Sequence, residues 1–486
     1  MRTKPASRIV IAGTGNITWE SGQEPISTID LMCRAVEDAA DDAGSRKLLR
    51  KADQIFIPKG TWNIDNPGSS IASAFGIEAK NVLFDLGVLQ SSLVKRAIQD
   101  VAEARSECTI IVGGETKELD KRLHGAIPTS TASDVTTANV LPEWVRAEEL
   151  VISRHEIDTG LIRAADQYAL IENAYAHENN LTRGQLIDLI NEEWKEMAKI
   201  SEAANAPWRK NACQYLDEQG WGRPIADPYC VNHITQWNVN QSAALIITTE
   251  ETAKAFGSSG HSWVYPKAII ESNNVTPLTE RQDLSSCIAM RFINEKLKSL
   301  TGKAASDREI VELYSCFPIA VRLQSEHLGL YNHDLSVTGG MTFAGGPFNN
   351  FTIQGISCVA KKIRDQETDG LVTSISGMLT KQGLFALSAK SDTSDFFHED
   401  VSTAVKRAMK TVDIKPDING RLRIISSTIA HTSQGPKAFV IAESDDHYRR
   451  VVTTLDPETT QAFSQDSHIG GVIDVDSSGS FEIETQ

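Results

Sequence analysis

The sequence predicts an α/β fold, and three patterns in its 486 residues lead to that prediction. Short apolar segments typical of strands alternate with amphipathic, helix-like segments through the N-terminal third of the chain. A strand–loop–helix–strand unit occurs twice, at 83–117 and at 335–381. After about Ser391 the pattern changes to short β segments separated by polar turns. We therefore expect a duplicated α/β core followed by a small β-rich domain.

The N-terminal segments support this assignment in chain order. Strands are predicted at Arg8–Ala12, Gln54–Pro58, Asn81–Phe84 and Cys108–Gly114. A helix is predicted from the capping pattern at Ser27 to about Ala43, and a second one, with its apolar residues on one face, at Gln90–Ala104. This alternation predicts a parallel sheet with right-handed crossovers.

A mostly helical insertion is predicted at about 116–235. It begins with a polar, loop-like stretch at Thr129–Thr137 and continues with helices at Tyr168–Glu178 and Arg183–Ser201. The core pattern then resumes in predicted strands at Ser242–Thr248, Trp263–Ser272, Glu309–Tyr314, Leu335–Thr338 and Gly370–Ser374. Near the C-terminus we expect a helix at Asp400–Thr411 and strands at Gly420–Ile429, Lys437–Glu443, Tyr448–Thr454 and Gly471–Asp476.

Composition restricts the possible partners. The net charge is −16, from 64 acidic and 48 basic residues without a basic stripe, which disfavours a nucleic-acid partner. No apolar run reaches the ~20 residues of a membrane span. The N-terminal MRTKPASRIVIAGTG leads directly into a strand pattern without the apolar region of a signal peptide, so we expect a cytoplasmic protein with no membrane partner.

The cysteines and histidines do not have the spacing of a metal site. The cysteines are Cys33, Cys108, Cys213, Cys230, Cys287, Cys316 and Cys358. Seven widely spaced cysteines without a CxxC pair predict neither a disulfide framework nor zinc ligation. The histidines in or near predicted core loops, which also form no ligand-like pair, are His124, His233, His327 and His333.

AGTGNIT, at Ala12–Thr18, raises the possibility of a dinucleotide-binding loop. Thr18 stands where the G-x-G-x-x-G fingerprint has its third glycine, and the next helix begins only near Thr28. We therefore interpret this segment as a tight turn after the first strand. A nicotinamide-dependent dehydrogenase is kept only as an alternative, which titration with NAD(H) and NADP(H) would test.

Cys316 is the cysteine in the most suggestive position. It follows a predicted strand, in YSCFP, and the carboxyl ends of strands are where α/β folds place ligands. A thiol acts as a nucleophile only where a base or a positive field favours its thiolate, and the sequence shows no base beside Cys316. A structural thiol and a catalytic thiol both remain open.

Several stretches in a fixed order resemble the thiolase superfamily, and within it the bacterial thiolase-like proteins of type 1 with an added C-terminal domain. They are LQSSLVKRAIQDVAE, IIVGGE, YALIENAYAHENNLTRGQLIDLINEEWKEMAKI, ELYSCFPIAVRLQSEHLGL, SVTGGMTFAGGPFNNF and GLVTSISGMLTKQG. The resemblance implies a five-layered αβαβα arrangement of two similar halves, with a loop domain inserted in the first. The expected domains are an N-terminal half at 1–252, a C-terminal half at 253–391 and an additional β-rich domain at 392–486.

The resemblance also implies where acyl-transfer residues would lie. The nucleophilic cysteine of the family falls at Leu89, its GHP histidine at Gly346 beside Gly345, and the second cysteine of its C-x-G motif at Ile375 before Gly377. Leucine cannot attack a thioester and glycine offers no imidazole, so the ordinary Cys-His-Cys mechanism is not expected.

Three more positions belong to the implied site. Asn349 lies in the glycine-rich loop, and Cys316 lies in the segment that matches the family's N-E-A-F motif. Gln382 stands where the type 1 relatives often have a histidine. The backbone N–H groups of the retained glycines remain available to an oxyanion.

The expected function follows from this resemblance. We expect a thiolase-like protein, similar to an acetyl-CoA acetyltransferase, that acts on or binds acyl-CoA thioesters, with a coenzyme A thioester as substrate or ligand and no bound cofactor or metal. A catalytic version would use Cys316 or a non-covalent mechanism. The alternative is a non-catalytic CoA-thioester-binding or scaffold protein. A monomer or a homodimer is expected.

Overall fold

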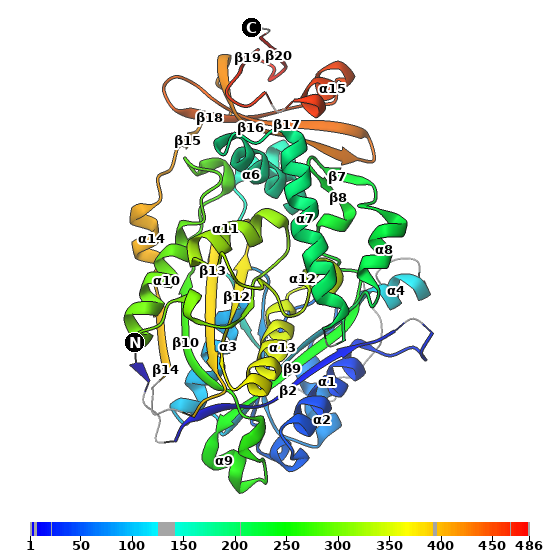
Figure 1. The fold of residues 1–486 in the computed structure, drawn as a ribbon, viewed down its shortest axis with the longest axis vertical. Coiled ribbons are helices and arrows are strands. Elements are labelled where there is room, and N and C mark those ends of the chain that lie inside the picture. The colour runs from blue at the N-terminus through cyan, green and yellow to red at the C-terminus, as the bar shows by residue number, and fades with distance from the viewer. Residues whose placement is uncertain are drawn as a thin grey trace.

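The computed structural model describes residues 2–3, 7–20, 22–124, 141–204, 206–391, 396–466 and 468–484. Two sheets with helices between and around them form the body, and a third sheet lies at one end of the molecule near the C-terminus (Figure 1). The polar loop predicted at Thr129–Thr137 lies outside the described residues.

The first sheet is mixed. Its strands, in spatial order, are β2 (Ile9–Thr18), β9 (Asn240–Thr249), β5 (Cys108–Thr116), β3 (Gln54–Pro58), β4 (Lys80–Phe84) and β6 (Glu143–Val145). The predicted parallel pairing is correct for β5, β3, β4 and β6, but wrong for β9, which runs antiparallel to β5 and β2. The reason is the insertion: the chain leaves β5 and enters β9 at the same end of the sheet, where Asn240 pairs with Thr116.

The prediction of a tight turn at Ala12–Thr18 is wrong, because β2 continues through this segment to Thr18 and pairs with β9. Its glycines are explained by close packing of the helix α1 (Thr28–Asp42) on the strand. A Cβ atom on Gly13 would lie 2.0 Å from the carbonyl oxygen of Ala39, and one on Gly15 would lie 2.0 Å from that of Ala35. AGTGNIT is therefore a helix-contacting strand and does not form a phosphate-binding loop.

The second sheet repeats the mixed pairing. Its strands, in spatial order, are β1 (Arg2–Thr3), β14 (Phe396–Asp400), β10 (Tyr265–Ser272), β13 (Lys381–Ser388), β12 (Asp369–Ser376) and β11 (Ile310–Glu312). The strand predicted at Leu335–Thr338 is absent, because the backbone N–H groups of Val337 and Thr338 donate to the Glu312 carboxylate rather than to a strand.

The helices complete five layers and cover the body. They are α1, α2 (Pro67–Phe75), α3 (Gln90–Ala102), α4 (Lys117–His124), α5 (Arg154–Thr159), α6 (Ala164–Glu178), α7 (Arg183–Glu202), α8 (Ala212–Gln219), α9 (Glu250–Ala255), α10 (Ile288–Thr301), α11 (Pro318–Leu328), α12 (Gly340–Phe343), α13 (Phe351–Gln366), α14 (Ser402–Ala408) and α15 (Pro457–Gln465). The α/β class is confirmed: α1 covers the first sheet, α3 and α13 fill the space between the sheets, and α10 and α11 cover the second sheet.

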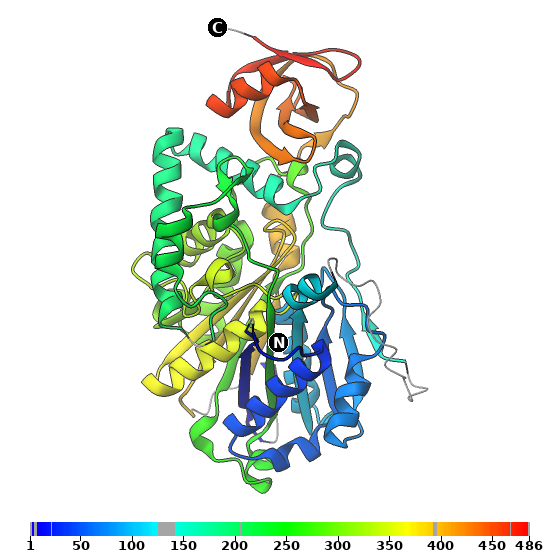
Figure 2. The same ribbon diagram turned by 90° about the vertical axis from the view of Figure 1, so that its right-hand side faces the viewer.

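The third sheet packs on the insertion. Its strands are β15 (Asp413–Ile414), β18 (Tyr448–Thr454), β17 (Gly435–Glu443), β16 (Gly420–Thr432), β19 (Val472–Val475) and β20 (Phe481–Ile483), with β7 (Pro224–Ala226) and β8 (Tyr229–Cys230) joined at one side. It has an apolar cluster of its own, to which α15 contributes Phe463. The sheet and α15 stand above the insertion helices α6 and α7 (Figure 2).

Candidate functional site

Three segments that are distant in sequence meet where α3 begins. The Gln90 side-chain oxygen accepts a hydrogen bond from the backbone N–H of Thr352 at 2.8 Å, which joins the start of α3 to the start of α13. The Ser91 and Ser374 hydroxyls lie 2.8 Å apart, which joins α3 to the end of β12. The structure therefore places Leu89 and Ile375, which adjoin these contacts, at one end of the layer between the sheets.

Leu89 is the residue that caps α3 at its N-terminus. Its side chain is 1% exposed and makes no capping hydrogen bond. The helix is fixed instead by Glu271 of β10, whose carboxylate accepts from the Ser91 hydroxyl at 2.7 Å and from the Ser92 hydroxyl at 2.8 Å and pairs with Lys95. The start of α3 is thus rigidly held, and the residue there is a buried aliphatic side chain.

Glu312 anchors the glycine-rich loop that begins at Val337. Its carboxylate accepts from the backbone N–H groups of Val337 at 2.8 Å and Thr338 at 2.9 Å. The hydroxyls of Ser336 and Thr338 donate to it at 3.0 Å. Complete burial raises the pKa of Glu312 to about 7, against the opposing effect of these donors. The loop is therefore held by a buried carboxyl group on β11.

The space beside Gly346 is already occupied. A Cβ atom on Gly346 would lie 2.5 Å from Cγ2 of Thr235 and 3.0 Å from Cε of Met341. Gly345 has a φ of 91°, and a Cβ there would lie 2.1 Å from the Gln241 side-chain oxygen. Both positions therefore exclude a side chain in this conformation, and Thr235 and Met341 fill the volume that a side chain at Gly346 would need.

Asn349 links this loop to the first sheet. It adopts a φ of 57°, and its side-chain amide donates to the carbonyl oxygen of Lys59 at 3.2 Å. The next residue, Asn350, donates to the carbonyl oxygen of Gly113 at 2.8 Å. These two amides explain why asparagine follows the glycines: they fix the loop to the ends of β3 and β5.

Ile375 and Gly377 lie where β12 turns into β13. Ile375 is 6% exposed and pairs with Gln382 across the two strands. Gly377 has a φ of 69°, its carbonyl accepts from the Tyr168 hydroxyl at 3.2 Å, and a Cβ atom there would lie 2.8 Å from Val151. A residue of the insertion therefore closes over this turn.

Cys316 lies between β11 and α11 and is buried. Burial raises the pKa of the Cys316 thiol to about 12, although the Tyr168 hydroxyl acts in the opposite direction. Its carbonyl oxygen accepts from the Thr235 backbone at 3.1 Å, and Phe317 stacks on Tyr168 with ring centroids 4.3 Å apart. The thiol is therefore protonated at neutral pH.

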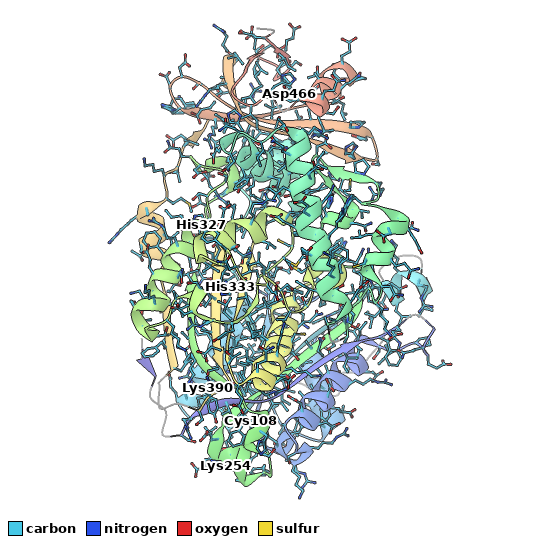
Figure 3. All side chains as sticks on the ribbon, in the orientation of Figure 1. Cys108, Lys254, His327, His333, Lys390 and Asp466 are labelled. Carbon is cyan, nitrogen blue, oxygen red and sulfur yellow. The ribbon has the colours of Figure 1, made fainter. Side chains whose placement is uncertain are left out.

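Two of the histidines noted in the sequence, His327 and His233, have defined ring contacts in the body. His327 of α11 donates to the Leu323 carbonyl at 2.9 Å, and His333 follows that helix (Figure 3). Burial lowers the pKa of His233 to about 4, and its ring stacks on Trp221 at 4.4 Å between centroids. Within the described ranges, no group of three or more metal-ligating side chains occurs and no helix has the length and apolarity to cross a membrane.

No protein-family model matches the chain. Over 239 residues, or 49% of its length, the chain is 25% identical to the acetyl-CoA acetyltransferase of Methanocaldococcus jannaschii, and the match spans 54% of that relative. Among solved structures, the monomeric SCP2-thiolase-like protein type 1 of Mycobacterium smegmatis is similar over 100% of both chains, with a TM-score of 0.81 at 22% identity.

The chain has a thiolase fold. The Ltp2–ChsH2(DUF35) aldolase matches 79% of this chain and 98% of its own, with a TM-score of 0.56 and 19% identity. The acetyl-CoA acetyltransferase of Syntrophomonas wolfei matches 79% of this chain and 100% of its own, with a TM-score of 0.54 and 11% identity. At these identities the structural likenesses establish the fold alone.

Sequence reasoning missed three residues that shape the site of this thiolase-fold chain. Tyr168 and Thr235 come from the insertion and contact the turn at Gly377 and the loop at Gly346. No local motif identifies them, since their role depends on how the insertion folds back. Glu312 does carry a signal, because an acidic residue in the apolar strand EIVELY needs buried donors.

Proposed function

We propose that this thiolase-fold chain binds an acyl-CoA thioester at the start of α3 and does not form an acyl-cysteine intermediate. The observation that carries the proposal is Leu89, a buried aliphatic side chain at the N-terminus of a helix that the rest of the structure holds in place. The curated relative's name, acetyl-CoA acetyltransferase, supports the ligand class over the half of that relative which the match spans.

The structure also supports the absence of a covalent step. At Gly346, Thr235 and Met341 occupy the volume that an imidazole would need. Burial raises the pKa of Cys316 to about 12, so its nucleophilic thiolate is disfavoured at neutral pH. What the site retains is polar backbone at the first turn of α3, where the helix dipole favours a carbonyl oxygen or an anion.

A catalytic version with Cys316 is the second candidate. One observation favours it: the thiol lies just before α11, where a helix N-terminus favours negative charge. If it operates, the wild-type chain forms a thioester adduct with acetyl-CoA, and Cys316→Ala abolishes both the adduct and acyl transfer.

The deciding experiment combines binding and intact-protein mass spectrometry. We expect acetyl-CoA to bind the wild-type chain saturably, by calorimetry, without an adduct or product. Leu89→Cys should become acetylated, because its thiol would lie at the start of α3. Leu93→Cys, at a residue of the same helix that is also 1% exposed, is the matched control and should stay unmodified. An adduct on the wild-type chain, or no saturable binding, would refute the proposal.

A further inference from the structure

A histidine of the body completes the edge of β18 in the third sheet. β15 pairs with β18 at Tyr448 and Arg449. Further along this strand, the backbone N–H of Val451 donates to Nε2 of His155, in α5, at 3.0 Å. An imidazole nitrogen accepts a hydrogen bond only when it carries no proton. The contact between α5 and the third sheet therefore requires a neutral His155.

The next residue of α5 anchors this helix to the body. Glu156 is 0% exposed, and its carboxylate accepts from the backbone N–H of Thr279 at 2.9 Å and from the hydroxyl of the same residue at 3.0 Å. His155 and Glu156 thus bind the third sheet and the body from one short helix. If His155 loses its contact, α5 stays with the body and β18 is the element that is freed.

The charges around His155 favour its neutral ring. Burial lowers the pKa of His155 below 6.5, and Arg450 of β18 acts in the same direction, while Asp158 of α5 opposes both. The charge of Asp158 is offset in part, because Arg154 lies 2.9 Å from it. The other charged side chains on α5 and on the strands beside it are bonded to partners other than this ring: Glu156, Lys437 and Arg449.

A second histidine of this interface has the opposite requirement. Nε2 of His431, in β16, has no hydrogen-bond partner in the described part of the chain and lies 3.8 Å from Oδ1 of Asp227, the residue after β7. Arg183 lies 3.5 Å from the other oxygen of that carboxylate. Arg163 donates to the carbonyl oxygen of His431 at 3.3 Å and is itself paired with Asp166. A protonated His431 would therefore gain a charged partner where His155 would lose an acceptor.

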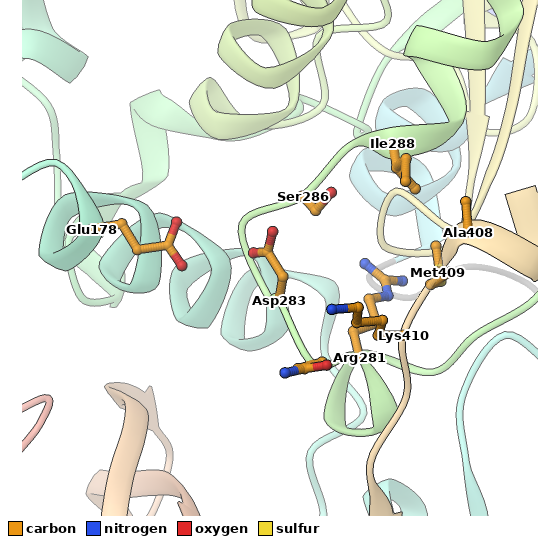
Figure 4. Close-up of a pocket in the computed structure, with 9 residues that line it drawn as sticks. Glu178, Arg281, Asp283, Ser286, Ile288, Ala408, Met409 and Lys410 are labelled. Atoms are coloured by element: carbon orange, nitrogen blue, oxygen red, sulfur yellow. The ribbon is translucent and has the colours of Figure 1, made fainter.

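Hollow spaces separate the third sheet from the body between these contacts. A cavity of about 440 Å³ lies between Glu178, at the end of α6, and the linker 409–412 that joins α14 to β15 (Figure 4). A second cavity, of about 470 Å³, lies between the linker at Val412 and Ile425 of β16. Because side chains do not fill these spaces, the polar contacts at the two sides contribute more of the docking than close packing does there.

The two histidines lie at well-separated points of the sheet. Val451 pairs with Ile441 and His431 pairs with Pro436, five positions apart in β17, which is roughly 17 Å along the strand. We propose that the third sheet docks through a pH-sensitive joint, in which protonation of His155 frees β18 from α5 while His431 holds β16 on Asp227. The sheet then opens on one side and stays closed on the other.

The direction of the pH effect follows from the lowered pKa of His155. The folded state favours the neutral ring, so the contribution of the contact with Val451 is fully present above about pH 6.5. It is lost as the pH falls through the lower pKa of the folded chain. Acid therefore opens the β18 side of the joint, and neutral pH closes it.

The test compares hydrogen exchange of the full chain at about pH 7.5 and about pH 5, as protection factors that correct for the intrinsic pH dependence of exchange. We expect protection at 448–454 to fall roughly tenfold in acid, since one hydrogen bond of the edge is lost, while protection at 427–432 is kept. In His155→Gln the side-chain oxygen accepts at both pH values, so protection at 448–454 should stay nearly constant. His155→Phe should have low protection at both.

His261→Gln, at an exposed histidine outside the joint, is the control and should keep the wild-type pH dependence. Arg450→Gln should move the midpoint of the transition to higher pH, because it removes a positive charge beside His155. Constant protection at 448–454 in the wild type, or a fall in acid that persists in His155→Gln, would overturn the proposal. An equal fall at 427–432 would also overturn it, because the whole sheet would then detach. If His155→Phe does not fold, His155→Gln and Arg450→Gln still decide the outcome.

Discussion

Single residues show which side chains occupy the space beside the glycines of the glycine-rich loop and of the β12–β13 turn. Thr235 and Met341 fill the space at Gly346, and Tyr168 and Val151 close over Gly377. The loop keeps its backbone path because Glu312 and Asn350 bind its two ends. The glycines of this loop are therefore needed for close packing as well as for the approach of any ligand.

Gly346→Ala tests this packing directly. The added Cβ would meet Thr235 Cγ2 at 2.5 Å, so we expect a loss of about 1–3 kcal/mol in the free energy of unfolding. Thr235→Ser removes that methyl group and keeps the hydroxyl, so the double variant should recover much of the loss. Denaturant unfolding of the wild type, the two single variants and the double variant measures the coupling free energy between the two substitutions. If the two effects on the free energy of unfolding simply add, contact with Thr235 does not limit the side chain at Gly346.

The buried carboxyl groups predict a pH dependence of stability. Burial raises the pKa of Glu312 and of Glu115 to about 7, from 4.5 for the ordinary side chain. The folded state therefore binds these protons more tightly than the unfolded chain. Their contribution is fully present below about pH 4.5 and is lost as the pH rises through about 7.

Glu312→Gln isolates one of these groups. Glutamine can keep its oxygen toward the N–H groups of Val337 and Thr338 while its NH₂ donates to the neighbouring hydroxyls. The free energy of unfolding of this variant should fall less steeply between pH 5 and 8 than that of the wild type, because one titrating group is gone. Equal slopes would show that Glu312 titrates normally in the folded chain.

At the scale of elements, the close packing of α1 on β2 requires glycine at the point of contact. The Ala39 carbonyl lies where a Cβ of Gly13 would be, at 2.0 Å, so Gly13→Ala should destabilise the chain by about 3 kcal/mol or more. Gly184 of α7 has no atom within 4 Å of such a Cβ, so Gly184→Ala should stabilise it by roughly 0.5–1 kcal/mol. Thermal unfolding shows whether each variant lowers or raises the melting temperature. Equal changes in the two variants would mean that the packing of α1 does not constrain β2.

Local patterns predicted most elements, and non-local contacts explain the errors. The Ser27 cap and the periodicity of Gln90–Ala104 correctly gave α1 and α3, since those signals lie within the helices. The prediction of a strand at Leu335–Thr338 was wrong because backbone N–H groups of this segment donate to Glu312. The prediction of a turn at Ala12–Thr18 was wrong because the glycines there allow α1 to pack closely on a strand.

The candidate site was predictable only as positions along the chain. The resemblance located Leu89, Gly346 and Ile375 in loops, and the structure joins the start of α3 to α13 and to β12 through neighbouring residues. The residues that surround these positions were not predictable, because Tyr168 and Thr235 come from the insertion. The sequence does not show how the insertion packs on the core.

At the scale of the whole molecule, Arg449 joins the third sheet to the body. It is 2% exposed, pairs with Glu443 at 2.7 Å and donates to backbone carbonyls of the segment at 279–282. Arg449→Met removes one donor from the buried Glu443 carboxylate and the guanidinium donors of several backbone carbonyls, so we expect a loss of about 3 kcal/mol and earlier cleavage of the linker by protease.

The control is the exposed pair of Arg421 and Glu484, also in the third sheet. Arg421 is 69% exposed at its side chain, so Arg421→Met should leave the unfolding midpoint close to that of the wild type. Similar losses in both variants would contradict a specific docking role for Arg449.

The pairing of β7 with β16 has a consequence for biosynthesis. Ala226 pairs with Ala430, so the insertion completes its sheet edge only with a strand synthesised roughly two hundred residues later. At about 5–20 residues per second, the edge of β7 that does not pair with β8 waits for many seconds without its partner. The nascent chain therefore carries an open strand edge at β7 through a large part of its synthesis, and chaperone binding there would protect that edge.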